Sequence, residues 1–312
     1  MDEYLLLSLP NLEITSKKSL NSGEFTSANT NYVVNIGSNK AVLYDLYFGG
    51  KLAEHTLPFV IKKHYQQGAW YGYQRHVYLT NENILLVLMV NSNVAVCKIT
   101  KEESGAATMQ TIHTLNTSEI EVSFPVEDFH VDDKFAYVVT ANGKVAKYKY
   151  LKKTEENNEI QLLISKQDPP KQLANNPHSN INFSCLKVSG DLLLTCFRSV
   201  DADNKKVRLG LVSYSSKALK QKYSYQSENC DYTDLTAQDM SIFTHKEIKW
   251  VFVLSIMKYY SLFAVRGHKI YPIDVLRGFC SDANNKVLGL EDGRIFVTTS
   301  GNRGLYAFKL TF

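Results

Sequence analysis

A strand–turn–strand unit recurs along the whole chain. Its cleanest copy covers residues 136–150, where two alternating apolar segments flank Asn142-Gly143. Asn-Gly readily adopts the positive φ angles of a tight hairpin turn. Five further copies have their turns near residues 38, 92, 203, 258 and 302. This repetition predicts a repeat protein that is built from small β-sheets.

The spacing of the copies predicts four-stranded blades. The mean step between turns is about 53 residues, close to the roughly 40–50 residues of a four-stranded blade. Segments beside the hairpins, such as Ile181–Val188 and Thr108–His113, are expected to be first and fourth strands. Proteins avoid long exposed sheet edges, and a radial arrangement of sheets protects them. We therefore predict one all-β domain over residues 1–312, a β-propeller of six four-stranded blades, or seven if 51–80 contains a degenerate blade.

The two ends of the chain complement each other in this scheme. The last hairpin runs to Phe312, which leaves no residues for a fourth strand, and residues 3–9 form an apolar β-like segment. We expect residues 3–9 to close the last blade. The alternative is that they form an ordinary first strand of the first blade. Helical periodicity is scarce, and only residues 54–67 could carry a turn or two of helix.

The composition fits a folded, strand-rich protein of the cytoplasm or nucleus. Hydrophobic residues make up 44% and charged residues 21% of the chain, as in ordinary soluble domains. The five cysteines include no Cys-x-x-Cys pair and lie mostly in apolar segments, so we expect buried free thiols. No secretory signal is visible, and no apolar run approaches the ~20 residues that span a membrane. We therefore expect no membrane insertion.

The net charge of +4 is mild. Basic pairs stand in predicted loops and turns, at Lys17-Lys18, Lys62-Lys63, Lys152-Lys153 and Lys205-Lys206. Solvated loop charge accounts for them, whereas a cluster of several on one face would form a patch for RNA, DNA or an acidic protein. No nucleic-acid-binding motif accompanies the pairs, so nucleic acid is a secondary partner hypothesis.

A search for catalytic chemistry finds one cluster. The chain has no Gly-x-x-x-x-Gly-Lys-Ser/Thr loop, no Gly-x-Ser-x-Gly elbow and no His-Glu-x-x-His helix. Asp128, His130 and Asp132 share one face of a strand by their period-two spacing. They could bind a divalent metal, or an Asp could orient the His as a general base. The alternative, which we favour, is hydrogen bonding to the neighbouring turn and strand, so we assign no catalytic residue, cofactor or metal site.

The segment between the first and second hairpins is rich in the residue types that dominate binding hot spots. These residues are Tyr65, Trp70, Tyr71, Tyr73 and Arg75. One interpretation is a partner-binding loop on one face of the propeller. The other is an outer strand whose aromatic side chains pack between blades, with Trp70 in the core.

The hairpin rhythm resembles that of WD40-like β-propellers. Lys149-Tyr150 and Tyr44-Asp45 stand at third-strand ends where that family has Trp-Asp, although the Gly-His and Trp-Asp pairs themselves are missing. The resemblance implies a rigid scaffold that presents several faces to other proteins, usually as a subunit of a larger complex, and no catalytic residues carry over. We therefore predict a non-enzymatic interaction scaffold. The alternatives are a metal-assisted hydrolase with its site at the propeller funnel and an RNA- or nucleoprotein-associated propeller subunit.

Overall fold

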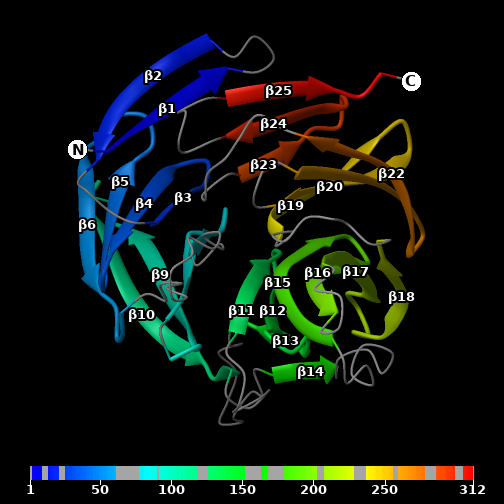
Figure 1. The fold of residues 1–312 in the computed structure, drawn as a ribbon. Coiled ribbons are helices and arrows are strands. Elements are labelled where there is room, and N and C mark those ends of the chain that lie inside the picture. The colour runs from blue at the N-terminus through cyan, green and yellow to red at the C-terminus, as the bar shows by residue number, and fades with distance from the viewer. Residues whose placement is uncertain are drawn as a thin grey trace. The chain divides into compact units, whose positions relative to one another are not determined.

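The computed structural model consists of strands and the turns that join them (Figure 1). It describes residues 2–8, 13–20, 25–60, 77–89, 91–103, 105–117, 126–151, 163–167, 179–201, 207–227, 237–255, 259–277, 286–298 and 305–311. These residues contain 25 strands and no α-helix. In these ranges there is accordingly no helix that could cross a lipid bilayer. The expectation of an all-β chain is confirmed.

Contacts divide the chain into two compact units. The first unit consists of Met1–Lys63 and His76–Ser118. The second consists of His64–Arg75 and Glu119–Phe312. The expectation that residues 1–312 form a single domain stays a prediction.

The described strands of the first unit form three antiparallel sheets. A two-stranded sheet pairs β1 (Asp2–Ser8) with β2 (Glu13–Leu20). A four-stranded sheet runs in chain order through β3 (Phe25–Ala28), β4 (Tyr32–Gly37), β5 (Lys40–Asp45) and β6 (Lys51–Thr56). The other runs in chain order through β7 (Val77–Leu79), β8 (Ile84–Leu88), β9 (Val94–Lys101) and β10 (Ala107–Leu115). In this sheet β1 pairs with β2 and not with β25. The closure of the last blade by residues 3–9 stays a prediction.

The second unit repeats the same plan. Three four-stranded antiparallel sheets and one three-stranded sheet follow one another along the chain. The first comprises β11 (Val126–Val131), β12 (Phe135–Thr140), β13 (Val145–Lys149) and β14 (Leu163–Gln167). The second comprises β15 (Ser179–Ser189), β16 (Leu192–Asp201), β17 (Val207–Ser215) and β18 (Gln221–Gln226). The third comprises β19 (Ala237–His245), β20 (Ile248–Ser255), β21 (Tyr259–Arg266) and β22 (Lys269–Arg277). The last comprises β23 (Lys286–Gly289), β24 (Arg294–Thr298) and β25 (Leu305–Lys309).

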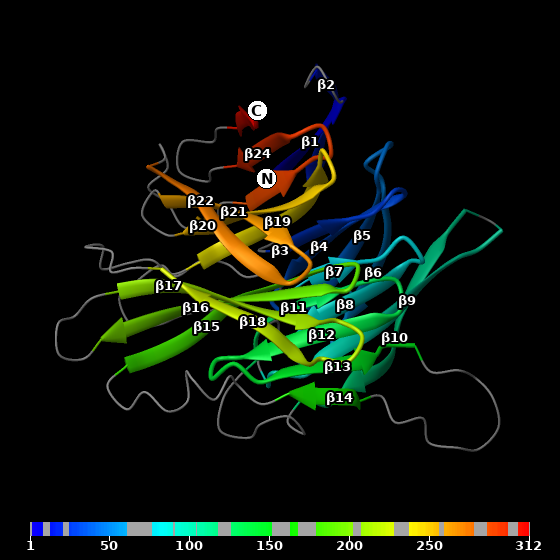
Figure 2. The ribbon, with the colours of Figure 1, turned by 90° about the vertical axis from the view of Figure 1, so that its right-hand side faces the viewer.

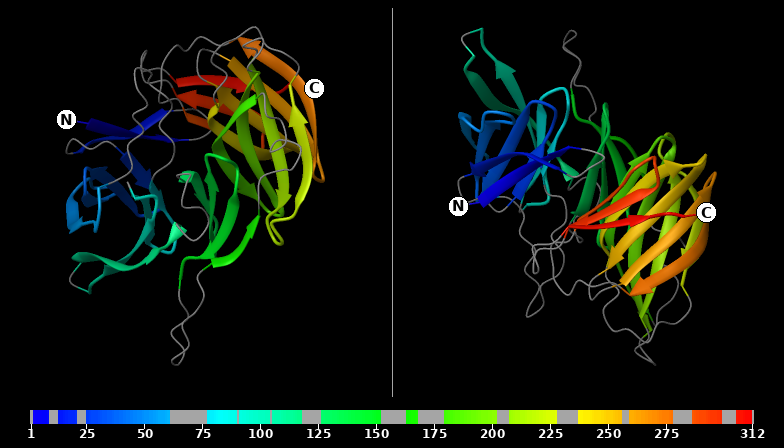
Figure 3. Two further views of the ribbon diagram at one scale, coloured as in Figure 1. Left: turned by 60° about the horizontal axis from the view of Figure 1, so that its bottom comes forward. Right: turned by 90° about the horizontal axis from the view of Figure 1, so that it is seen from above.

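Neighbouring sheets within a unit pack with equivalent strands side by side. In the first unit the first strands β3 and β7 are in contact, and so are the fourth strands β6 and β10. In the second unit the first strands β11, β15, β19 and β23 are in contact in that order, and β18 contacts β22 (Figures 2 and 3). The β15–β18 and β19–β22 sheets, which have a neighbouring sheet on each side, therefore bury both faces of their middle strands.

All six predicted hairpins form the second and third strands of a sheet. They are β4–β5, β8–β9, β12–β13, β16–β17, β20–β21 and β24–β25. β25 has no buried residue, but the other strands are mostly buried, as in β8, whose five residues are all buried. Their continuous apolar runs reflect this burial on both faces. The expectation of a helical turn within residues 54–67 is wrong for residues 54–56, because these residues form the end of β6. The side chains of this outer strand are either exposed or only partly buried.

A three-residue turn with one left-handed residue recurs at several hairpin tips. In the turn that joins β12 to β13, the Thr140 amide donates to the Lys144 carbonyl at 2.9 Å, and the Gly143 amide donates to the Thr140 carbonyl at 2.8 Å. Gly143 has φ of +89°. The same pair of bonds recurs in four turns whose left-handed residues are Asn83, Ser92, Gly105 and Gly293. The Asn142-Gly143 hairpin is therefore confirmed, with a loop of three residues in which Gly143 supplies the positive φ.

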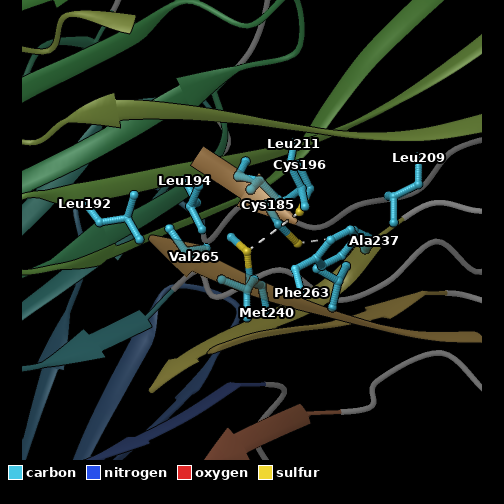
Figure 4. Close-up of a cluster of buried hydrophobic side chains, with 13 residues drawn as sticks. Cys185, Leu192, Leu194, Cys196, Leu209, Leu211, Ala237, Met240, Phe263 and Val265 are labelled. Carbon is cyan, nitrogen blue, oxygen red and sulfur yellow. Dashed lines mark hydrogen bonds between the residues drawn. The ribbon is translucent and has the colours of Figure 1, made fainter. Parts of the chain in front are cut away.

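The apolar core of the second unit includes a cluster between the β15–β18 and β19–β22 sheets (Figure 4). Leucines of β16 and β17 lie in this cluster together with Phe263 and Val265 of the next sheet. Two thiols lie in this cluster: Cys185 Sγ donates to the Ala237 carbonyl at 3.4 Å, and Cys196 Sγ lies 3.8 Å from Met240 Sδ. The described cysteines, which are Cys97, Cys185 and Cys196, are all free and buried, as expected.

Candidate interaction site

Asp128 lies on the first strand of its sheet and bonds to the next sheet. Its Oδ2 accepts a hydrogen bond from the Leu186 amide of β15 at 2.8 Å, and its Oδ1 accepts one from the Phe129 amide at 2.9 Å. Burial raises the pKa of the Asp128 carboxyl to about 6, and the nearby Lys187 ammonium opposes that rise. Both oxygens of the Asp128 carboxylate therefore accept hydrogen bonds from backbone amides, one in its own sheet and one in the next sheet.

The same position of the repeat is used twice more. Asp128, Cys185 and Asp239 each follow a bulge at the same place in a first strand. Asp239 Oδ2 accepts a hydrogen bond from the Val287 amide at 3.1 Å, and its Oδ1 lies 3.4 Å from Lys187 Nζ. Buried carboxylates need such partners because an unpaired buried charge is strongly unfavourable. This row of inner-strand side chains therefore joins the sheets of the second unit.

Asp132 caps a turn. Its Oδ1 accepts hydrogen bonds from the Lys134 and Phe135 amides at 2.9 and 2.8 Å, and its Oδ2 accepts one from the Tyr137 hydroxyl at 2.9 Å. His130 is partly buried on β11. Asp128 therefore binds backbone amides of two sheets, whereas Asp132 binds the amides and the hydroxyl around one turn. Within the described ranges, no three His, Cys, Asp or Glu side chains lie together in a way that could hold a metal ion.

The proposed aromatic loop lies outside the described residues. This applies to Tyr65, Trp70, Tyr71, Tyr73 and Arg75. Of the four basic pairs, Lys17-Lys18 lies on β2, and the pairs at 62, 152 and 205 lie outside the described residues. The binding loop and the basic patch therefore stay predictions.

Large apolar side chains stand exposed at several places on the described surface, and the sequence reasoning missed them. In the turn between β5 and β6, Tyr47 is 60% and Phe48 is 84% exposed. On β22, an outer strand, Tyr271, Ile273 and Val275 are 38%, 49% and 57% exposed. The alternation of these three residues with Pro272 and Asp274 was the sequence signal that could have revealed them, although the register shifts at Ile273, so the three side chains do not all share one face.

The backbone edge of β22 is poorly suited to adding a further strand. Pro272 has no amide hydrogen, and the Asp274 carboxylate accepts a hydrogen bond from the Val275 amide at 2.7 Å. Proline and charged side chains on an edge strand are devices that protect sheet edges. A partner at β22 would accordingly contact the side chains of the β22 stripe, defined as Tyr271, Ile273 and Val275.

Comparison with known proteins gives the fold and the family. The family profile described as "Utp8, N-terminal beta propeller" matches residues 76–296. No curated protein matches the chain significantly. A chain in the S. cerevisiae structure of Dbp5 bound to Nup159, Gle1, IP6 and ADP is similar with a TM-score of 0.52 at 10% identity, over 95% of this chain and 77% of that chain. The WD40 domain of Toxoplasma gondii coronin has a TM-score of 0.45 at 11% identity, over 91% of this chain and 79% of that chain.

The profile match covers more than half of the chain and runs from strand β7 into strand β24. The similarity to the S. cerevisiae chain agrees with it in fold. The six repeating sheets are therefore the blades of a WD40-like propeller, and the chain belongs to the Utp8 N-terminal β-propeller family.

Proposed function

We propose that this propeller is a non-enzymatic interaction scaffold, and that it works as part of a multi-subunit complex in the cytoplasm or nucleus. The observation that carries the proposal is the contrast between its interior and its surface. Buried Asp128 and Asp239 bind backbone amides, whereas large apolar side chains stand exposed on an ordered turn and on β22. Exposed apolar patches on ordered structure mark sites of protein interaction.

The family description supports a role as one domain of a longer protein. In Utp8 the propeller of this family is N-terminal. We infer that the present propeller likewise serves as a docking domain, since propellers offer several rigid faces to other proteins.

The aromatic segment is proposed as a second binding element. An alanine scan of Tyr65, Trp70, Tyr71, Tyr73 and Arg75 tests this. Loss of partner binding at an unchanged melting temperature supports a binding loop. Loss of melting temperature with each aromatic change supports packing between blades instead.

The proposed function is tested by native purification of the full chain under near-physiological salt, followed by quantitative mass spectrometry and sizing. A fixed set of proteins at constant stoichiometry is expected. A chain that stays monomeric and recovers no protein in defined ratio would refute the scaffold. Stoichiometric metal that is lost on Asp128→Asn substitution would favour the hydrolase alternative, and steeply salt-dependent RNA binding would favour the nucleoprotein alternative.

A further inference from the structure

The turn between β5 and β6 is held by a dense set of hydrogen bonds. The Asp45 amide donates to the Gly50 carbonyl at 3.0 Å, and the Gly49 amide donates to the Asp45 carbonyl at 3.0 Å. Asp45 Oδ1 accepts hydrogen bonds from both the Tyr47 and the Phe48 amides at 2.8 Å. Gly49 has φ of +74°, which suits glycine. Residues 45–50, called the Phe48 turn below, therefore have a defined conformation.

The Phe48 turn is also anchored at its base. The Leu46 amide donates to the Asn31 carbonyl at 2.9 Å, and the Leu46 side chain packs on the buried Val33 and Tyr44. The two tip residues, by contrast, point outward with 60% and 84% of their surface exposed. An aromatic side chain on a rigid backbone loses little conformational entropy when it binds, and this favours binding.

A second blade has the same turn with different tip residues. In residues 215–220, called the Ala218 turn, the Ser215 amide donates to the Lys220 carbonyl at 2.9 Å, as Asp45 donates to Gly50. The Ser216 amide donates to the Asp191 carbonyl at 2.9 Å, and the Ala218 amide donates to Ser215 Oγ at 3.4 Å. Both turns therefore use a capping side chain at their first residue and a carbonyl of the preceding hairpin.

The comparison shows that this turn does not require aromatic tips. The positions that hold Tyr47 and Phe48 in one turn hold Lys217 and Ala218 in the other, where both are exposed. Surface turns normally carry polar or small residues because exposed aromatic surface is unfavourable in water. Folding of the turn therefore explains neither Tyr47 nor Phe48.

The charges beside the Phe48 turn indicate the chemistry of what it binds. No charged residue lies between Leu46 and Gly50. The two nearby lysines are held by one carboxylate: Lys40 Nζ lies 3.0 Å from Glu54 Oε1, and Lys51 Nζ lies 2.7 Å from Glu54 Oε2. These hydrogen bonds lower the pKa of Glu54 to about 2, so it stays ionised at neutral pH. The lysines are thus engaged with a carboxylate, while a phosphate-bearing surface would favour unpaired cations beside the aromatic residues.

We propose that the Phe48 turn is a docking element whose Tyr47 and Phe48 side chains insert into an uncharged apolar pocket of a partner protein. This inference rests on the proposed scaffold function and assigns a site to it. Gly50 suits this role, because a Cβ built there meets no atom within 4 Å and a partner could approach the backbone closely. The matching pocket is lined by aliphatic or aromatic side chains, because aromatic anchors of this kind fill desolvated pockets at the centres of interfaces.

The test begins with site-specific crosslinking in cells that express the full chain. Phe48 is replaced by p-benzoylphenylalanine, and Ala218 is replaced in a matched control. Crosslinked peptides are sequenced to find the partner protein and the residues that the probe reached. A crosslink that forms from position 48 alone and maps to apolar residues of a folded partner is expected.

The purified partner is then titrated against wild type and against the double variant Tyr47→Lys, Phe48→Ala. This variant carries the tip of the Ala218 turn, so its melting temperature should be unchanged. We expect its affinity to fall by at least about tenfold, as for loss of a hot-spot aromatic residue. Phe48→Leu should bind more tightly than Phe48→Ala because it keeps part of the apolar surface. Ala218→Lys in the Ala218 turn serves as a control for general surface change and should bind like wild type.

Several outcomes would overturn the proposal. One is a partner that binds wild type and the double variant equally, which would leave the scaffold function standing and remove this site from it. Another is Phe48-dependent binding to phosphatidylserine vesicles or to poly(U) RNA, since that would assign the turn to a lipid or nucleic acid surface. If no protein crosslinks at position 48 and none co-purifies in defined ratio, both the site and the scaffold function fail.

Discussion

Substitution of Gly143 by alanine tests how closely the β12–β13 turn packs against the β15–β18 sheet. Gly143 combines two constraints. Its φ is +89°, and a Cβ at this position would lie 2.2 Å from Cε2 and 2.6 Å from Cζ of Phe183, which belongs to the next blade. The Phe183 amide also donates to the Ala141 carbonyl at 3.0 Å, so the strand that carries the ring is tied to the turn. The Phe183 ring is itself buried and packs on the Phe197 ring, so it has little room to move away.

The two constraints have separate expected costs. A left-handed φ costs an alanine roughly 1–2 kcal/mol. Overpacking of a methyl group against a fixed neighbour typically costs about 1–3 kcal/mol. We therefore expect Gly143→Ala to lower the free energy of unfolding by about 2–5 kcal/mol.

Gly105→Ala is the matched control. Gly105 lies in the same kind of three-residue turn with φ of +85°, but a Cβ at this position would have no atom within 4 Å. It should therefore show the conformational cost alone, about 1–2 kcal/mol. Gly210→Ala is the converse control, since its φ is not left-handed and a Cβ there would lie 1.9 Å from Cζ of Phe197.

Urea unfolding followed by circular dichroism measures each free energy, with each variant compared with wild type in the same transition. Adding Phe183→Leu to Gly143→Ala makes room for the methyl group and should recover about 1–3 kcal/mol in a double-mutant cycle. The reasoning is refuted if Gly143→Ala costs no more than Gly105→Ala, or if the cycle shows no coupling between positions 143 and 183.

Three further predictions concern the buried and capping side chains. The stability of wild type relative to Asp128→Asn should fall by about 3 kcal/mol as pH rises from 4 to above 6, because burial raises the pKa of Asp128 from 3.8 to about 6. In that range the folded state holds the proton and the unfolded state releases it, and urea titrations that give a pH-independent difference would contradict this. Asp132→Ala should cost about 1–3 kcal/mol, because two amides and the Tyr137 hydroxyl lose their acceptor; an unchanged melting temperature would argue against the cap. Thiol labelling read by peptide mass spectrometry should be slow in native protein and fast in urea for Cys97, Cys185 and Cys196, because burial raises the pKa of each thiol. Rapid native labelling at any of these three sites would show that it is accessible.

Most of the hairpins could be predicted because their strands are largely buried. Segments 84–88 and 192–197 are apolar apart from Thr195 and stand between turn residues, and both features can be recognised in a single sequence. The outer strands are harder to predict. Residues 51–56 are mostly polar, and three of the six residues are exposed because other elements cover this strand only in part. Polar strands of this kind resemble loops or helical turns in sequence.

The candidate sites were less predictable for a physical reason. The period-two pattern placed Asp128 and Asp132 on one strand face, but their hydrogen-bond partners depend on which amides the next sheet and the following turn present. Leu186 is 58 residues away from Asp128 in sequence. Exposure of Tyr47 and Phe48 likewise follows from a turn that Asp45 organises, and no periodic pattern marks such a position. Three-dimensional context therefore decides the role of each side chain.

The bonds between first strands have a consequence for synthesis of the chain. Asp128 is made 58 residues before the Leu186 amide that it binds, and Asp239 is made 48 residues before the Val287 amide. Each of these two blades of the second unit thus leaves the ribosome before the amide of the following blade that its carboxylate binds has been made. A nascent chain that pauses between the two members of a pair exposes a solvated acceptor, and arrival of the next blade both desolvates it and satisfies it. The order of translation is therefore also the order in which these blades become able to lock together.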